Sequence, residues 1–243
     1  MNLKGIDISE FNGSIDFKKL KKEVDFVYIR ATYGRFGLDK RMKEYAEGCI
    51  KYEIPFSFYY YSYATTKELA SDEVKFFLQA INKYKEKLIF PVMIDMEDSD
   101  SYKLNHGNPS KELLTDICIV ACEKIAEEKL SPIIYANADW FNHKLDLEKL
   151  KNYMKWIAWW ETAETNIDKE KYQIWQYSSK GEINGIKGKV DLDYSFVDFI
   201  SLSQYIKNVS MINFIKSKTF LNDLDVQYLS CYKWRSTFNY QII

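Results

Sequence analysis

The sequence contains little that would hold a metal, cross a membrane or attract a nucleic acid. Its 243 residues include four cysteines and two histidines, and the formal net charge is -1. The cysteines show no paired zinc spacing, so we interpret them as core thiols of a reducing compartment: Cys49, Cys118, Cys122 and Cys231. A chain without net positive charge lacks the field that neutralises phosphates, and we therefore expect no nucleic-acid partner.

Long apolar runs are missing as well. No run approaches the ~20 residues that a helical membrane span requires. The first residues, MNLKGIDISEFNG, lack the basic and then apolar pattern of a secretory signal. We therefore predict no membrane span and a protein made in the cytoplasm without a signal peptide.

Aromatic side chains, by contrast, are abundant. They make up 16% of the chain, with 19 tyrosines and six tryptophans, within an otherwise ordinary globular composition of 47% hydrophobic and 28% charged residues. Flat rings with a polar edge are suited to stacking on sugars or bases. The length fits one large domain, or one domain with a small appendage.

Strand and helix patterns alternate in the first part of the chain and then give way to strands alone. The expected strands are 3–8, 25–33, 54–64, 88–97 and 132–137, with helices near 39–52, after Thr65 or Thr66, and over 110–128. Three more strands follow without long helices between them, at 155–161, 172–179 and 189–196. The predicted fold class is α/β, a TIM-like barrel of eight strands with helices mainly after the first five.

The last part of the chain differs in character from the barrel. From residue 201 onward it has five basic and two acidic residues, and some 43 residues are marginal for an independent core. We therefore divide the chain into a barrel domain, 1–198, and a short C-terminal extension, 199–243. Packing on the barrel, self-association into a homo-oligomer, and targeting are the roles we consider for this extension.

Acidic residues recur at the expected strand ends. In PVMIDMED (91–98), Asp95 and Glu97 face the same way because strand side chains alternate. One such pair alone also fits a strand ending in solvated acids. The first strand, however, ends with Asp7, and the last offers Asp191 and Asp193 on one face. Carboxyls gathered at one rim of a barrel raise each other's pKa, and a protonated acid beside an ionised one is what glycosidic bond cleavage requires.

Aromatic residues lie near several other strand ends. Any one of them would fit a core, but together they predict a sugar-binding groove. The candidates are Tyr59, Tyr61, Tyr63, Tyr135 with Asn137, Trp159 or Trp160, and Trp175 with Tyr177.

These motifs, taken in order, resemble the glycoside hydrolase family 25 muramidases, the Chalaropsis-type lysozymes of bacteria and their phages. The matching stretches are KGIDISEFNGSIDF, DFVYIRATYG, PFSFYYYSYA, PVMIDMED, PIIYANADWF, WIAWW and IWQYSSKGEINGIKGKVDLDY. The resemblance implies a (β/α)5β3 barrel, and a glycosidase that cleaves the β-1,4 bond between N-acetylmuramic acid and N-acetylglucosamine in bacterial peptidoglycan. It implies no cofactor and no metal.

The resemblance also implies roles for individual residues. Glu97 matches the proton donor and Asp95 its partner acid, which would orient an attacking 2-acetamido group of the substrate or serve an inverting reaction. Asp7 and Asp191 match two further acids of the cluster. WIAWW departs from the family pattern after its alanine, at Trp159 and Trp160. Without a signal peptide, such an enzyme would reach the wall after release through holin-type pores or lysis, as a phage endolysin or a bacterial autolysin does.

Two other functions fit parts of the sequence. A catalytically silent peptidoglycan-binding barrel would share the fold but would be expected to lack an acid, and all four are present. A metal-dependent hydrolase would need histidine at strand ends, whereas His106 and His143 both lie outside the expected strands.

Overall fold

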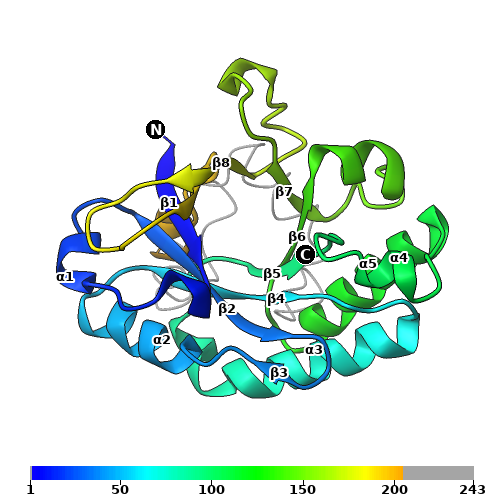
Figure 1. The fold of residues 1–243 in the computed structure, drawn as a ribbon, viewed down its shortest axis with the longest axis horizontal. Coiled ribbons are helices and arrows are strands. Elements are labelled where there is room, and N and C mark those ends of the chain that lie inside the picture. The colour runs from blue at the N-terminus through cyan, green and yellow to red at the C-terminus, as the bar shows by residue number, and fades with distance from the viewer. Residues whose placement is uncertain (1, 205–243) are drawn as a thin grey trace, which may run out of the picture.

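The chain folds into a closed barrel of eight strands, as predicted. The computed structural model describes residues 2–204, so most of the extension predicted at 199–243 lies outside the described residues. The barrel strands are β1 (Leu3–Ile8), β2 (Phe26–Tyr33), β4 (Phe56–Tyr61), β5 (Val92–Asp95), β6 (Pro132–Asn137), β7 (Met154–Ala158), β8 (Ile174–Gly181) and β9 (Val190–Ser195). β1 pairs with both β2 and β9, which closes the ring (Figure 1). The two-residue strand β3 (Gly37–Leu38) pairs only with the end of β2.

The last strand runs against its neighbours. β1, β2 and β4 through β8 pair in parallel, whereas β9 is antiparallel to both β8 and β1. The rim formed by the C-terminal ends of the parallel strands is therefore also the rim at which β9 begins. This reversal decides which acid of the last strand reaches that rim.

Helices cover the outside of the first half of the barrel. They are α1 (Phe17–Leu20), α2 (Met42–Lys51), α3 (Lys67–Ile81), α4 (Tyr102–Asn105) and α5 (Lys111–Glu127). The short segments η1 (Glu10–Asn12), η2 (Asn82–Lys87) and η4 (Glu164–Asn166) are 3-10 turns. After β6, the fifth barrel strand, the helical segment is the short π-helix η3 (Trp140–Lys144). Figure 1 shows loops and short turns between β7, β8 and β9.

Two hydroxyl caps start the long helices where the sequence changes pattern. The Thr66 side chain accepts from the Leu69 amide at 3.2 Å, and the Ser110 side chain accepts from the Leu113 amide at 3.2 Å. Each cap satisfies an amide that would otherwise lack a helical partner. Of the two candidate caps for α3, Thr65 and Thr66, the structure therefore selects Thr66.

Apolar side chains form two layers, one between the strands and helices and one inside the barrel. The inner layer contains mainly large rings, among them Phe26, Tyr28, Phe90 and Trp156. Phe199 belongs to this layer and packs against Phe90, with ring centroids 5.2 Å apart. The domain boundary expected after residue 198 thus falls within a segment that packs on the barrel. Across residues 2–204, every helix is too short or too polar to cross a bilayer.

Candidate active site

Asp7 and Asp191 are opposed at one rim of the barrel. They are register partners in the antiparallel pairing of β1 with β9, Asp7 near the end of its strand and Asp191 near the start of its own. Asp7 is 7% exposed and Asp191 is half-buried. Burial and then the charge of Asp191 raise the pKa of Asp7 well above its usual value, and burial raises the pKa of Asp191 to about 6.

Asp95 and Glu97 reach the same rim from β5. The strand ends at Asp95, earlier than the expected end at residue 97, but the Met96 amide still donates to the Tyr135 carbonyl at 2.9 Å. The chain therefore stays extended, and Glu97 continues on the side of Asp95. Asp95 is buried and Glu97 is half-buried.

Electrostatic interactions tie the four acids into one cluster. Burial raises the pKa of Glu97 to about 7, with Asp191 adding to the rise and Lys103 opposing it. Burial also raises the pKa of Asp95 well above its usual value, followed by the charges of Glu97 and Asp7. Carboxyls that interact this strongly titrate as a group, so the cluster holds protons at pH values where isolated carboxyls are ionised.

Gln176 on β8 connects this cluster to the surrounding rings. Its side-chain nitrogen donates to Asp7 Oδ2 at 2.8 Å, and its oxygen accepts from Tyr135 Oη and from Trp160 Nε1, each at 3.0 Å. Gln176 is buried, and these three bonds use both ends of its amide. We had not predicted this residue, because a glutamine between two aromatic residues carries no signal of its own in a single sequence.

Asp193 lies deeper in the barrel than the rim acids. It pairs with Gly5, two residues before Asp7, and its side chain is fully buried. Its carboxyl lies beside the side chains of Asp7 and Trp156. Burial, followed by the charges of Asp7 and Asp191, raises its pKa well above the usual value and so favours the protonated form of this carboxyl.

Three of the predicted binding tyrosines surround the acids. Tyr59 and Tyr135 are 7% and 6% exposed, and burial followed by nearby carboxyls, Asp7 for the first and Glu97 for the second, raises their pKa. The Tyr61 hydroxyl lies 3.2 Å from Ser99 Oγ, just beyond Glu97 in the chain. These rings form a wall around the carboxyls.

The remaining predicted binding residues divide between the mouth and the outside of the barrel. Trp159 and Trp160 are 40% and 48% exposed, and Trp160 is the one that bonds to Gln176. The Asn137 side chain accepts from the amide of Trp140, the first residue of η3, at 2.9 Å. Tyr63 donates to Asp100 at 2.9 Å on the loop that follows Glu97.

Trp175 and Tyr177 do not join the acids, which corrects our prediction for them. Trp175 is 4% exposed and packs with Tyr177 and Tyr194 in the layer outside the barrel. Gln176, between them in sequence, points inward to Asp7. Because neighbouring strand residues face opposite sides, the inward glutamine sends both rings outward.

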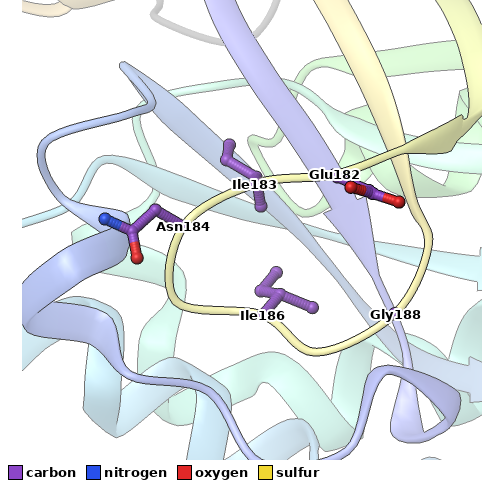
Figure 2. A pocket seen from close by; sticks show the side chains of 5 residues that line it. All are labelled: Glu182, Ile183, Asn184, Ile186 and Gly188. Atoms are coloured by element: carbon purple, nitrogen blue, oxygen red, sulfur yellow. The ribbon is translucent and has the colours of Figure 1, made fainter.

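A hollow of about 510 Å³ lies apart from these carboxyls. It is lined by five residues of the loop that joins β8 to β9 (Figure 2): Glu182, Ile183, Asn184, Ile186 and Gly188. This loop is attached to the segment after β1, since the Asp16 amide donates to the Gly185 carbonyl at 2.8 Å and Ile15 bridges to Ile186. The attachment holds the start of β9, and with it Asp191, against β1.

No grouping of three or more His, Cys, Asp or Glu suited to a metal ion occurs among residues 2–204. His106 stacks on Tyr102, with ring centroids 3.9 Å apart, and His143 contacts Asp139 at 2.9 Å. Both histidines lie outside the barrel strands.

Comparison with known proteins identifies related chains. The model of the glycosyl hydrolases family 25 matches residues 6–186. The autolytic lysozyme of Clostridium acetobutylicum is 29% identical over 192 residues, which are 79% of this chain and 55% of that protein. Lysozyme M1 of Streptomyces globisporus is 23% identical over 197 residues, covering 78% of this chain and 66% of that one.

Solved structures share the same fold. The modular autolysin LytC from Streptococcus pneumoniae superposes with a TM-score of 0.71 at 25% identity, over 80% of this chain and 47% of that one. The CTP1L endolysin superposes with a TM-score of 0.69 at 26% identity, over 84% and 70% of the two chains. This chain thus spans about half the length of the autolytic lysozyme and of the pneumococcal autolysin.

Proposed function

The chain belongs to glycosyl hydrolase family 25, and on this basis we propose that it is a muramidase acting on bacterial peptidoglycan. The bond that we propose it cleaves is the β-1,4 linkage between N-acetylmuramic acid and N-acetylglucosamine. The observation that carries the proposal is the cluster of Asp7, Asp95, Glu97 and Asp191 at one rim of the barrel, held among buried rings. Lysozymes of Clostridium and Streptomyces among the relatives support it.

Glu97 is the proton donor in this proposal. Its pKa of about 7 keeps a large fraction of the carboxyl protonated near neutral pH. Glu97 is also more exposed than Asp95, because it lies beyond the end of β5. A substrate entering from the rim would therefore meet Glu97 first, and the leaving oxygen could take its proton.

Asp95 is the stabilising partner acid. Positive charge develops at the anomeric carbon during glycosidic cleavage, and an ionised carboxylate nearby lowers the energy of that state. Two cationic side chains, Lys103 and Arg30, favour the ionised form of Asp95 against the effects of burial and neighbouring acids. A proton held on Asp7 would leave Asp95 and Asp191 to carry the cluster's negative charge.

The rings around the cluster are the proposed sugar-binding surface. Tyr59, Tyr61 and Tyr135 enclose the carboxyls, while Trp159 and Trp160 are exposed at the mouth. Exposed tryptophans present flat apolar faces that suit the faces of pyranose rings. Asn137 lies at the end of β6 near this wall, although its side chain is engaged with Trp140.

Digestion of purified peptidoglycan tests the proposed activity. The protein should release fragments whose new reducing ends are muramic acid, identified by mass analysis after borohydride reduction. Glu97→Gln should lose this activity by at least about 100-fold while its circular dichroism and unfolding midpoint stay near those of the wild type. Binding to peptidoglycan without release of reducing ends would instead support a silent binding barrel, and glucosamine ends would contradict the proposed bond.

We propose that the barrel domain ends later than residue 198. Because Phe199 packs inside the barrel layer and residues 199–204 are helical, we propose that the barrel unit extends through this segment. The remaining residues would serve self-association or wall targeting. Comparison of the full chain with one ending after residue 204, by light scattering and by co-sedimentation with cell walls, distinguishes these roles: loss of a dimer supports the first, and loss of wall binding the second.

A further inference from the structure

Lys103 is a buried cation that no motif in the sequence singles out. It lies on the four-residue helix α4 and is 2% exposed. Its ammonium donates to the backbone carbonyl of Glu97 at 2.7 Å and to the backbone carbonyl of Ser62. A lysine this buried loses solvation free energy, so its retention in the interior calls for a compensating role.

The ammonium lies among the connections that follow three consecutive strands. Ser62 directly follows β4, and Glu97 follows β5. The Tyr61 ring centroid, at the end of β4, is 5.5 Å from the ammonium, and the Trp140 ring, in η3 after β6, is 5.9 Å away. Both rings are within the range of a cation–π interaction. One side chain thereby connects the segments that carry the proton donor and part of the ring wall.

Further hydrogen bonds hold Lys103 and the Ser62 segment that it contacts. The Lys103 amide donates to Asp98 Oδ1 at 2.7 Å, which fixes the start of α4 to the residue after Glu97. On the other side, Glu73 of α3 accepts from Ser62 Oγ at 2.7 Å and from the Tyr63 amide at 2.9 Å. The Ser62 segment is thus held by α3 and by Lys103 together.

We propose that Lys103 is a positioning residue of the acid cluster, which fixes the chain at Glu97 through its carbonyl and supplies buried positive charge beside Asp95 and Glu97. The inference rests on the proposed function, because it assigns Lys103 a role in the same site. The ammonium donates to a carbonyl of Glu97, so its effect on the two carboxyls is exerted through space.

The charged groups around Lys103, Glu97 and Asp95 define the expected effect of removing the Lys103 charge. Lys103 faces Glu73 of α3, Asp95 of β5 and Cys118 of α5. It also faces Asp98, in the loop after β5. Glu97 faces Lys103, Asp191, Asp100 and Asp98, and interacts with Asp7 and Asp95. Asp95 faces Glu97, Asp7, Lys103 and Arg30. Lys103 lowers the pKa of both Asp95 and Glu97.

Removal of the charge should therefore move both limbs of the pH–activity profile in the same direction. Without Lys103 the pKa of Asp95 rises, so the acidic limb moves to higher pH. The pKa of Glu97 rises too, so the donor keeps its proton up to a higher pH and the basic limb also moves to higher pH. The expected shift is on the order of half to one pH unit for each limb. A merely structural residue would lower activity at all pH values without moving the limbs.

The test compares Lys103→Gln, which keeps donors but removes the charge, with Lys103→Arg, which keeps the charge. Lys103→Gln should shift both limbs upward, and Lys103→Arg should not. Lys155→Gln is the matched control, because Lys155 is also buried, on β7, and donates to the Leu150 and Tyr153 carbonyls at 2.9 and 2.6 Å. It should lose stability without moving either limb. Coincident limbs for Lys103→Gln and the wild type would overturn the proposal.

Two further measurements support the test. The first does not depend on activity, and the second does not use a Lys103 variant. Carbon-13 NMR titration of the Asp and Glu carboxyls in the absence of substrate should show the same upward shifts in Lys103→Gln, even if the wild type released no muramic acid ends. Reciprocity requires that Asp95→Asn lower the pKa of the Lys103 ammonium, which nitrogen-15 NMR can follow in a chain that retains Lys103. An unchanged ammonium pKa in Asp95→Asn would also overturn the proposal.

Discussion

Asp7 and Asp191 face each other across the antiparallel pairing of β1 with β9, one near the end of its strand and the other near the beginning. Their proximity raises the pKa of Asp7, and Asp191 also raises the pKa of Glu97. A residue far along the chain from PVMIDMED thus helps to keep the proposed proton donor protonated.

Asp191→Asn should move the basic limb of the pH–activity profile to lower pH. The substitution removes a negative charge that favours the protonated form of Glu97, so the donor loses its proton earlier, by on the order of half a pH unit. Initial rates of wall hydrolysis between pH 4 and 9 measure the shift. Glu182→Gln, in the loop before β9, removes a charge that is paired with Lys189 and should leave the limb in place. A limb that moved upward in Asp191→Asn would contradict the assignment.

Gln176→Leu should impair both activity and stability. The substitution leaves the Tyr135 hydroxyl, the Trp160 indole and Asp7 without their shared partner, at a cost on the order of 1–3 kcal/mol in the free energy of unfolding. Denaturant unfolding measures this loss. The pKa of Asp7 should rise further, because the bond from Gln176 favours its ionised form. An unfolding free energy equal to that of the wild type would mean that these hydrogen bonds contribute nothing net.

Glu73→Gln should make stability less dependent on pH. Burial raises the pKa of Glu73 to about 7, against an ordinary value of 4.5. Between these values the folded state holds a proton that the unfolded chain has released, so the free energy of unfolding falls as pH rises from about 4.5 to 7. The loss amounts to at most about 3 kcal/mol for this one group.

Denaturant unfolding at pH 4.5 and pH 7.5 measures this difference. The wild type should lose more stability across the interval than Glu73→Gln does. Glu68→Gln, on an exposed position of the same helix, should retain nearly the full wild-type loss. Equal losses in the wild type and Glu73→Gln would show that Glu73 titrates at an ordinary pKa in the folded protein.

Trp160→Ala should mainly change substrate binding, whereas Trp175→Ala should mainly change stability. Trp160 is half exposed at the mouth, so its loss should weaken substrate binding, seen as a higher KM, with a smaller change in stability. Trp175 is buried outside the barrel, so its loss should cost about 3–5 kcal/mol of stability. Kinetics on soluble peptidoglycan fragments and denaturant unfolding separate the two effects. A KM effect for Trp175→Ala without destabilisation would restore its predicted place in the groove.

Much of the site was predictable because strand periodicity is a local property. The alternation in PVMIDMED puts Asp95 and Glu97 on one face, and the alternation in VDLDY does the same for Asp191 and Asp193. Alternation defines two faces but does not say which of them points into the barrel. For that reason Trp175 and Tyr177 were predicted as binding residues, whereas the structure turns Gln176 inward and both rings outward.

The sequence by itself determined where the barrel strands lie along the chain and which acids pair at the strand ends, since each depends on neighbouring residues. Only the tertiary structure decided the direction of β9, which brings Asp191 to the rim and leaves Asp193 buried beneath Asp7. It alone placed Lys103 under Glu97 and Gln176 beside Asp7. These contacts join segments far apart in the chain, and barrel closure, which local patterns do not encode, is what brings them together.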